Sequence, residues 1–222
     1  MSTSTKRLLA AWALFDIFLL AAGALSLTLS IVWRAPNLLL NLTFSNTDLL
    51  FGTILGIILL STFVISIIAI IQRNNSIAGL VVLNWTLLID AIVILIVGTY
   101  IWVYTLHERN NYHTVFGRQS NATKILIQDT LKCCGYFSAT DEVAFGGSFC
   151  PNNAAAIAAN SFCVTPITQF ADMTLNNTFS TVYGFMAIVI GLFLATTCVI
   201  KKRQEYHRFE KIDAKRGGQG FV

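Results

Sequence analysis

The chain has 222 residues, of which 55% are hydrophobic and only 12% are charged. An ordinary soluble domain carries roughly 25% charged residues, so this composition excludes a chain whose whole surface faces water. The formal net charge is +4, and the basic residues gather beside apolar runs instead of forming one basic face. This distribution argues against nucleic acid as a partner and favours the anionic surface of a membrane.

The first apolar run follows Lys6 and Arg7, an arrangement that also begins a signal peptide. It continues to Trp33, well beyond the roughly 7 to 15 apolar residues of a signal peptide. We therefore expect a retained transmembrane helix.

Four apolar stretches each reach the roughly 20 residues that cross the hydrocarbon core of a bilayer. Backbone groups inside hydrocarbon must bond within their own segment, so even stretches rich in β-branched residues are predicted to be helical. The sequence predicts an all-α membrane protein, with transmembrane helices at residues 8–33, 49–71, 77–106 and 179–200.

The orientation follows from Lys and Arg in the short flanking segments, which stay on the cytoplasmic side. These residues place both ends of the chain in the cytoplasm of a plasma-membrane or endomembrane protein. The cytoplasmic segments are then 1–7, 72–76 and 201–222, and the outside segments are a small loop at 34–48 and a large loop at 107–178.

Three glycosylation sequons fall in these outside segments, at Asn41, Asn121 and Asn176. Asn41 and Asn176 lie close to predicted membrane ends, where a glycosylating enzyme has poor access. Asn121 is therefore the best candidate. A fourth sequon, at Asn84, lies inside the third predicted helix and should stay unmodified.

Four of the five cysteines lie in the large loop: Cys133, Cys134, Cys150 and Cys163. An even set in an oxidising compartment predicts two disulfides. A bridge between the neighbours Cys133 and Cys134 would be strained, which leaves two possible pairings. Free thiols or metal ligands are the less favoured interpretation, because no His follows at ligand spacing. No metal site is expected.

The sequence Cys133-Cys134-Gly135, in the last loop of a four-helix protein, resembles the Cys-Cys-Gly signature of the tetraspanin family. The small first loop, the short turn at 72–76 and the short tail extend the resemblance over nearly the whole chain. The resemblance implies pairing of Cys133 with Cys163 and of Cys134 with Cys150, with a backbone turn at Gly135.

The end of the chain, Phe209 to Val222, resembles a tetraspanin subgroup of filamentous fungi. That resemblance implies a role in polarised penetration structures and in cell-surface morphogenesis.

Two bridges from one Cys-Cys pair would gather residues 140–163, called the lobe below, over a helical stalk at 107–131. On the chain-entropy model each bridge stabilises by roughly 3 kcal/mol. The apolar residues of the lobe could form a partner-binding surface, or they could simply fill the interior of the lobe. The two interpretations are equally favoured. The candidate contact residues are Phe145, Phe149 and Phe162.

Three polar residues lie inside predicted spans: Asp16, Asn84 and Asp90. A carboxylate at a helix centre costs about 2.5 to 3.5 kcal/mol on insertion scales, so these side chains should face the bundle interior. Asp16 and Asn84 lie at similar depths, which predicts a hydrogen bond between them. Asp90 has no obvious mate in the second or fourth helix, so a proton or ion relay is an alternative interpretation.

Small residues at four-residue spacing predict close packing of the first and second spans. They are Gly52 and Gly56 in the second span, and Ala22 and Ser26 in the first.

Cys198 precedes the basic cluster that begins at Lys201 and is a candidate for S-palmitoylation. The alternative is a small buried apolar residue. The segment 201–216 holds seven basic and three acidic residues, so it could bind anionic inner-leaflet lipid. Sterol is a second expected lipid partner.

The sequence contains no catalytic or phosphate-binding motif that we could identify, and we expect neither an enzyme nor a cofactor. The favoured function is a membrane scaffold that recruits other membrane proteins, or copies of itself, through its large loop and helix faces. The alternative is a lipid- or ion-handling protein that uses Asp16 and Asp90.

Overall fold

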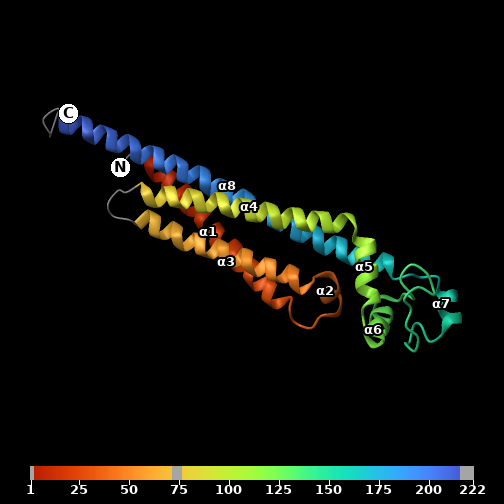
Figure 1. Cartoon of the computed structure of the whole chain (residues 1–222). Coiled ribbons are helices and arrows are strands. Elements are labelled where there is room, and N and C mark those ends of the chain that lie inside the picture. Colours follow the sequence, from red (N-terminus) through yellow and green to blue (C-terminus); the bar gives the residue numbers. More distant parts are fainter. Residues whose placement is uncertain (1–2, 72–76, 216–222) are drawn as a thin grey trace. The chain divides into compact units, whose positions relative to one another are not determined.

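The computed structural model describes residues 3–71 and 77–215. The predicted turn at 72–76 and residues 216–222, at the end of the tail, lie outside this range. The described residues form eight α-helices and no strand, which confirms the all-α prediction. The helices are α1 (Thr3–Val32), α2 (Leu38–Thr43), α3 (Asn46–Ile71), α4 (Ala78–Leu106), α5 (Glu108–Gly117), α6 (Asn121–Leu131), α7 (Asn153–Ala159) and α8 (Val164–Lys215), and Figure 1 shows them in chain order.

Four of these helices, α1, α3, α4 and α8, are long and apolar enough to cross a membrane, as predicted. In none of them is more than 39% of the apolar window buried inside the structure. Large apolar side chains such as Ile68, Trp85 and Ile96 are exposed. Since water would not tolerate so much apolar surface, lipid is the fitting solvent for these faces.

Helix α8 is much longer than the predicted span at 179–200, because it runs without interruption for 52 residues. Pro166 lies in its first turn, where proline is tolerated. After the apolar stretch, Lys and Arg residues continue the helix because they are good helix formers. A change in hydropathy therefore predicts a membrane boundary and does not mark the end of a helix.

Two loop segments contain structure that the sequence did not predict. The small loop includes the short helix α2, and the stalk is two helices, α5 and α6, separated by residues 118–120. Ser120 caps α6 by accepting a hydrogen bond from the backbone N–H of Thr123 at 3.2 Å. Such a cap favours a new helix start, which explains the break in the stalk.

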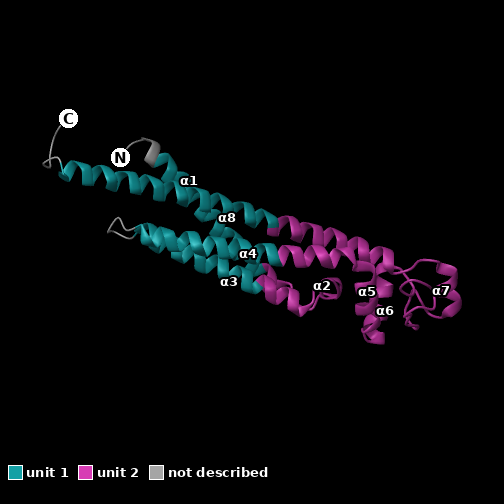
Figure 2. Cartoon of the chain, turned by 45° about the horizontal axis from the view of Figure 1, so that its top comes forward, with its two compact units in different colours: residues 1–28, 53–96, 183–222 teal, residues 29–52, 97–182 magenta. Residues whose placement is uncertain are grey.

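The chain divides into two compact units, coloured separately in Figure 2. Unit 1 comprises residues 1–28, 53–96 and 183–222, and its described part consists of segments of the four long helices. Leucines such as Leu19, Leu59, Leu87 and Leu192 fill its interior.

Unit 2 comprises residues 29–52 and 97–182 and contains α2, α5, α6 and α7. Its main core joins the small loop to the large one. Leu42 and Phe44 pack with Tyr112 and Phe116 of α5 and with Ile127 of α6. The Tyr112 hydroxyl also lies 3.5 Å from the carbonyl oxygen of Thr43. The small loop is thus an integral part of the fold of unit 2.

Candidate functional site

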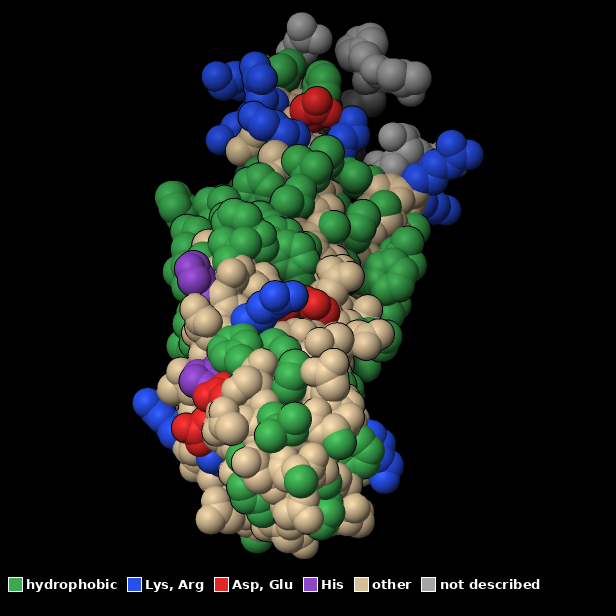
Figure 3. Space-filling view, turned by 90° about the vertical axis from the view of Figure 1, so that its right-hand side faces the viewer, with side chains coloured by type: hydrophobic (Ala, Val, Ile, Leu, Met, Phe, Trp, Pro, Cys, Tyr) green, Lys and Arg blue, Asp and Glu red, His purple; other side chains and the backbone are tan. Residues whose placement is uncertain are grey.

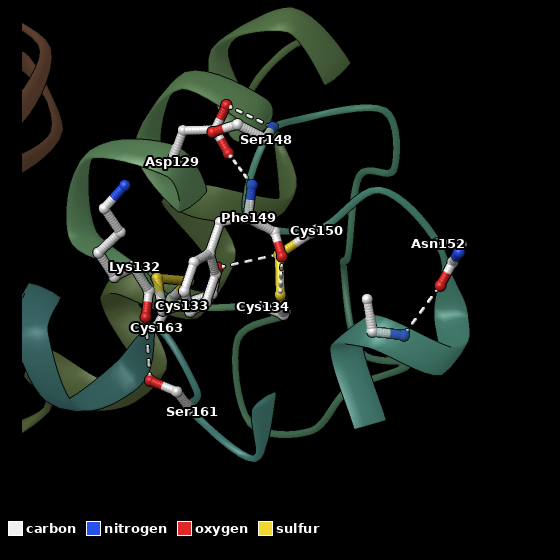
Figure 4. The surroundings of a disulfide bond; sticks show 11 residues. Asp129, Lys132, Cys133, Cys134, Ser148, Phe149, Cys150, Asn152, Ser161 and Cys163 are labelled. Atoms are coloured by element: carbon white, nitrogen blue, oxygen red, sulfur yellow. Dashed lines mark hydrogen bonds between the residues drawn. A yellow bond between two sulfur atoms is a disulfide. The ribbon is translucent and has the colours of Figure 1, made fainter. Parts of the chain in front are cut away.

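Two disulfides hold the lobe, Cys133–Cys163 and Cys134–Cys150, and all four cysteines are buried. The prediction of two bridges is confirmed. The pairing is also the one implied by the Cys-Cys-Gly resemblance. Figure 4 shows both bridges starting from the same end of α6.

The two bridges belong to different cores. Cys133 and Cys163 lie in the main core of unit 2, so their bridge ties the end of α6 to the start of α8. Cys134 and Cys150 form a separate small cluster with Ala156 of α7. The Cys134–Cys150 bridge therefore lies within the lobe, while the Cys133–Cys163 bridge connects the lobe to the main core of unit 2.

The turn at Gly135 can be formed only by glycine. Its φ is +69°, and a Cβ atom there would overlap the carbonyl oxygen of Ser138. The buried side chain of Gln128 braces this turn. With its amide oriented to satisfy both neighbours, Gln128 accepts a hydrogen bond from the Gly135 N–H at 3.0 Å and donates one to the Ala144 carbonyl at 2.8 Å. The sequence pattern predicted Gly135 but not Gln128.

Asp129, near the end of α6, holds the loop that leads to Cys150. Its carboxylate accepts hydrogen bonds from the backbone N–H groups of Ser148 at 3.0 Å and Phe149 at 2.8 Å (Figure 4). These two bonds, together with the charge of Lys132, hold the pKa of Asp129 below its usual value. A Cβ atom at Gly147 would meet Asp129 Oδ1 at 2.7 Å, so glycine there permits this close approach.

Two polar side-chain pairs join helices α5 and α6 to the start of the lobe. The almost fully buried Lys124 of α6 pairs with Glu142 and lies over the ring of Phe116. His113 of α5 lies 3.2 Å from Asp141. These contacts tie α5 and α6 to residues 141–142.

The three phenylalanines proposed as partner contacts differ in exposure. Phe145 is 44% exposed. Phe149 is partly buried against the Cys134–Cys150 cluster, and Phe162 is half-buried. Ile157 of α7 is 61% exposed, and Phe137, before the lobe, is exposed as well. Figure 3 shows small, separate groups of hydrophobic side chains in the lower part of the view and broader hydrophobic areas in its upper part.

The three candidate glycosylation sites are all exposed asparagines. Asn121 begins α6, beside the cap at Ser120. Asn41 lies in α2, but the hydroxyl of its sequon Thr43 is turned inward and donates to the Leu39 carbonyl at 2.9 Å. Asn176 lies within the continuous helix α8.

In unit 1, Asp16 is buried as predicted, but its neighbour is not Asn84. The Asp16 carboxyl group faces the Ser66 hydroxyl of α3. Asp16 Oδ1 and Ser66 Oγ have no well-formed hydrogen bond within the described residues. Asn84 instead donates to Thr197 Oγ1 of α8 at 3.1 Å. The predicted Asp16–Asn84 bond is therefore wrong: equal depth does not determine which faces of two helices meet.

Asp90 does have a hydrogen-bonding partner on a neighbouring helix, contrary to the expectation from the sequence. The Thr62 hydroxyl of α3 hydrogen-bonds to its carboxyl group, while Asp90 Oδ2 has no partner in the described part of the chain. Both aspartate side chains are buried inside unit 1. Thr62 and Ser66 are four residues apart on one face of α3, which could have identified them as polar partners.

Helices α1 and α3 approach closely around Gly56. A Cβ atom at Gly56 would lie 2.9 Å from the Leu27 backbone nitrogen and 3.1 Å from the Gly23 carbonyl oxygen. Ala22 is buried and Ser26 is half-buried. In unit 2, a Cβ atom at Gly52 would meet Ser30 Cβ at 3.3 Å. The pattern missed Gly23 of α1, where a Cβ atom would lie 2.9 Å from Leu60 Cγ of α3.

Unit 1 also contains contacts between α1 and α8 that the sequence did not predict. Trp12 donates its ring N–H to Thr196 Oγ1 at 3.2 Å, and Gly191 leaves room for the ring of Phe15. Cys198, further along α8, is an exposed free thiol.

Among the described residues, no group of three or more His, Cys, Asp and Glu side chains is placed to hold a metal ion. No protein-family model, no curated protein and no solved structure matches the chain.

Proposed function

We propose that the chain is a tetraspanin-like membrane scaffold, with both ends in the cytoplasm and the lobe outside, and that the lobe recruits partner membrane proteins. The observation that carries this proposal is the construction of the lobe. Its backbone is held by two disulfides and by Asp129, and yet it exposes Phe145 and Ile157. A backbone held in place in this way suits recognition by exposed apolar side chains, because binding then costs little conformational entropy.

The charge pattern supports a protein partner. Residues 143–171 include no Asp, Glu, Lys or Arg, so the lobe offers an uncharged surface beyond Asp141 and Glu142, which pair with His113 and Lys124. The cores of protein interfaces are depleted in charged residues and enriched in aromatic ones. The resemblance to fungal tetraspanins extends the proposal to membranes of polarised growth or penetration structures.

The test is affinity purification of full-length protein in mild detergent, followed by mass spectrometry. Deleting residues 140–163 would remove two bridged cysteines and disturb the base, so point variants are sharper. We expect the pair Phe145→Ser and Ile157→Ser to lose specific partners that wild type retains. The matched control is Asn153→Ser with Thr140→Ser, two exposed polar positions in the same lobe. Equal partner sets for all three proteins would reject recruitment by the lobe.

A second candidate function rests on the buried polar atoms of unit 1. Asp16 Oδ1, Asn84 Oδ1 and Asp90 Oδ2 have no partners among the described residues, and unpaired polar atoms in a span mark candidate ion or proton sites. Loss of function in Asp90→Asn, at normal surface level and with unchanged partners, would favour this lipid- or ion-handling role over the scaffold.

A further inference from the structure

Unit 2 contains an open groove that the scaffold function does not use. It has a volume of about 660 Å³ and lies between the C-terminal end of α4 and the N-terminal third of α8. This volume is within the roughly 300–1,000 Å³ of small-molecule sites. The main lining residues are Trp102 and Thr105 of α4 and Asp172, Met173, Asn176 and Phe179 of α8.

Polar and apolar side chains both line the groove along its length. On α8, Asp172 comes first and Phe179 follows seven residues later, about 10 Å further along the helix. On α4, which approaches the lobe as the chain proceeds, Thr105 lies beyond Trp102. The acidic Asp172 therefore lies at the end nearer the lobe and Phe179 at the opposite end, with Met173 and Asn176 between them along α8. An acidic group at one end and an aromatic ring at the other fit a membrane lipid whose headgroup points toward the lobe.

The charge at the polar end selects the headgroup. The exposed Asp172 lies beside Glu108 at the start of α5. Partial burial and the neighbouring Asp172 raise the pKa of Glu108 to about 7, although Arg109 acts in the opposite direction. Two acidic side chains therefore meet at this end of the groove, which disfavours an anionic headgroup and favours a cationic one.

Aromatic side chains add to this preference. Trp102 is 52% exposed, and tryptophan is the best aromatic partner for quaternary and primary ammonium groups. The side chain of Met173, which also lines the groove, is 67% exposed and offers apolar contact to the first carbons of an acyl chain. A sterol, by contrast, would leave the negative charge unused.

We propose that this groove binds a zwitterionic phospholipid, with the ammonium group of its choline or ethanolamine headgroup against Asp172 and Trp102. The proposal rests on the membrane setting proposed above, but it is independent of recruitment by the lobe.

The experiment uses full-length protein in micelles that contain equal amounts of phosphatidylcholine and phosphatidylglycerol with the same acyl chains. Native mass spectrometry then counts each lipid that stays bound. We expect a preference for phosphatidylcholine of about two- to five-fold, as exposed charge and cation–π contacts provide. Asp172→Asn or Trp102→Leu should bring the ratio close to one. The matched controls are Asp213→Asn on the distant end of α8 and Trp85→Leu on α4, which should retain the preference.

Equal retention of the two lipids by wild type would overturn the proposal, and so would an equal loss in the groove and control variants. Displacement of the lipid by millimolar free choline would also overturn it, because the groove would then be a site for small ammonium ions. Partner co-purification by the same variants separates this outcome from failure of the scaffold function: Asp172→Asn should keep the partners that Phe145→Ser with Ile157→Ser loses.

Discussion

Asp129 joins the end of α6 to the lobe through the backbone of Phe149, whose N–H donates to Asp129 Oδ1 at 2.8 Å. Phe149 directly precedes Cys150. A single carboxylate therefore positions the loop segment that carries Cys150 of the second disulfide. The hydrogen bond and the disulfide hold the same segment.

The first prediction concerns acid sensitivity at Asp129. Because its pKa is lowered in the folded state, the stabilisation is fully present above the usual value of 3.8 and is lost as the pH falls through the lower folded value. Limited proteolysis of wild type should show the lobe becoming more sensitive below about pH 4. Asp129→Ala should be equally sensitive at neutral pH, and a resistant variant would contradict this role. Asp213→Asn is the control.

The second prediction concerns Glu108 and has the opposite sign. Its pKa is raised from 4.5 to about 7, so the folded state binds more protons than the unfolded state between these values. Stability should therefore fall as the pH rises from 4.5 to 7. Glu108→Gln should remove this slope and raise neutral-pH stability by less than about 1 kcal/mol, since solvent screens the pair. Thermal unfolding in detergent across this pH range is the measurement; an unchanged slope would exclude Glu108 as its source.

The third prediction compares two glycines with positive φ, Gly135 at +69° and Gly146 at +105°. An added Cβ at Gly135 would overlap the Ser138 carbonyl, whereas at Gly146 it would meet nothing within 4 Å. Gly146→Ala should cost only the backbone strain, about 1–2 kcal/mol. Gly135→Ala should cost more and leave free thiols in the lobe. Thiol titration of non-reduced protein distinguishes them, and equal titres would reject the steric argument.

The fourth prediction tests the contact between α1 and α3. Gly56→Ala would push against the Leu27 backbone, and overpacking of this kind costs typically about 1–3 kcal/mol. Gly184→Ala meets no atom within 4 Å and should leave stability unchanged or slightly raised, because alanine is the better helix former. The measurement is the midpoint temperature at which half of the monodisperse protein is lost on heating, compared between the two variants. Equal midpoints for the two variants would show that the contact is not tight.

Part of the site could be predicted because its signals are local. The cysteine count in one exported segment predicts two bridges, and Gly135 after the cysteine pair predicts a turn. Gln128 and Asp129 gave no such signal: their roles depend on how the end of α6 faces Gly135 and residues 148–149, which are 7 to 20 residues away along the chain.

The sequence by itself determined the all-α class, the four membrane-length helices and the two-bridge framework, because hydropathy, segment length and cysteine count are properties of the chain alone. Only the tertiary structure decided that Asp16 faces Ser66, that Asn84 bonds to Thr197 and that Asp90 bonds to Thr62. The long helices are apolar nearly all the way round, so no polar face reveals how each is rotated. Packing against neighbouring helices sets that rotation, and with it the partner of every buried polar group.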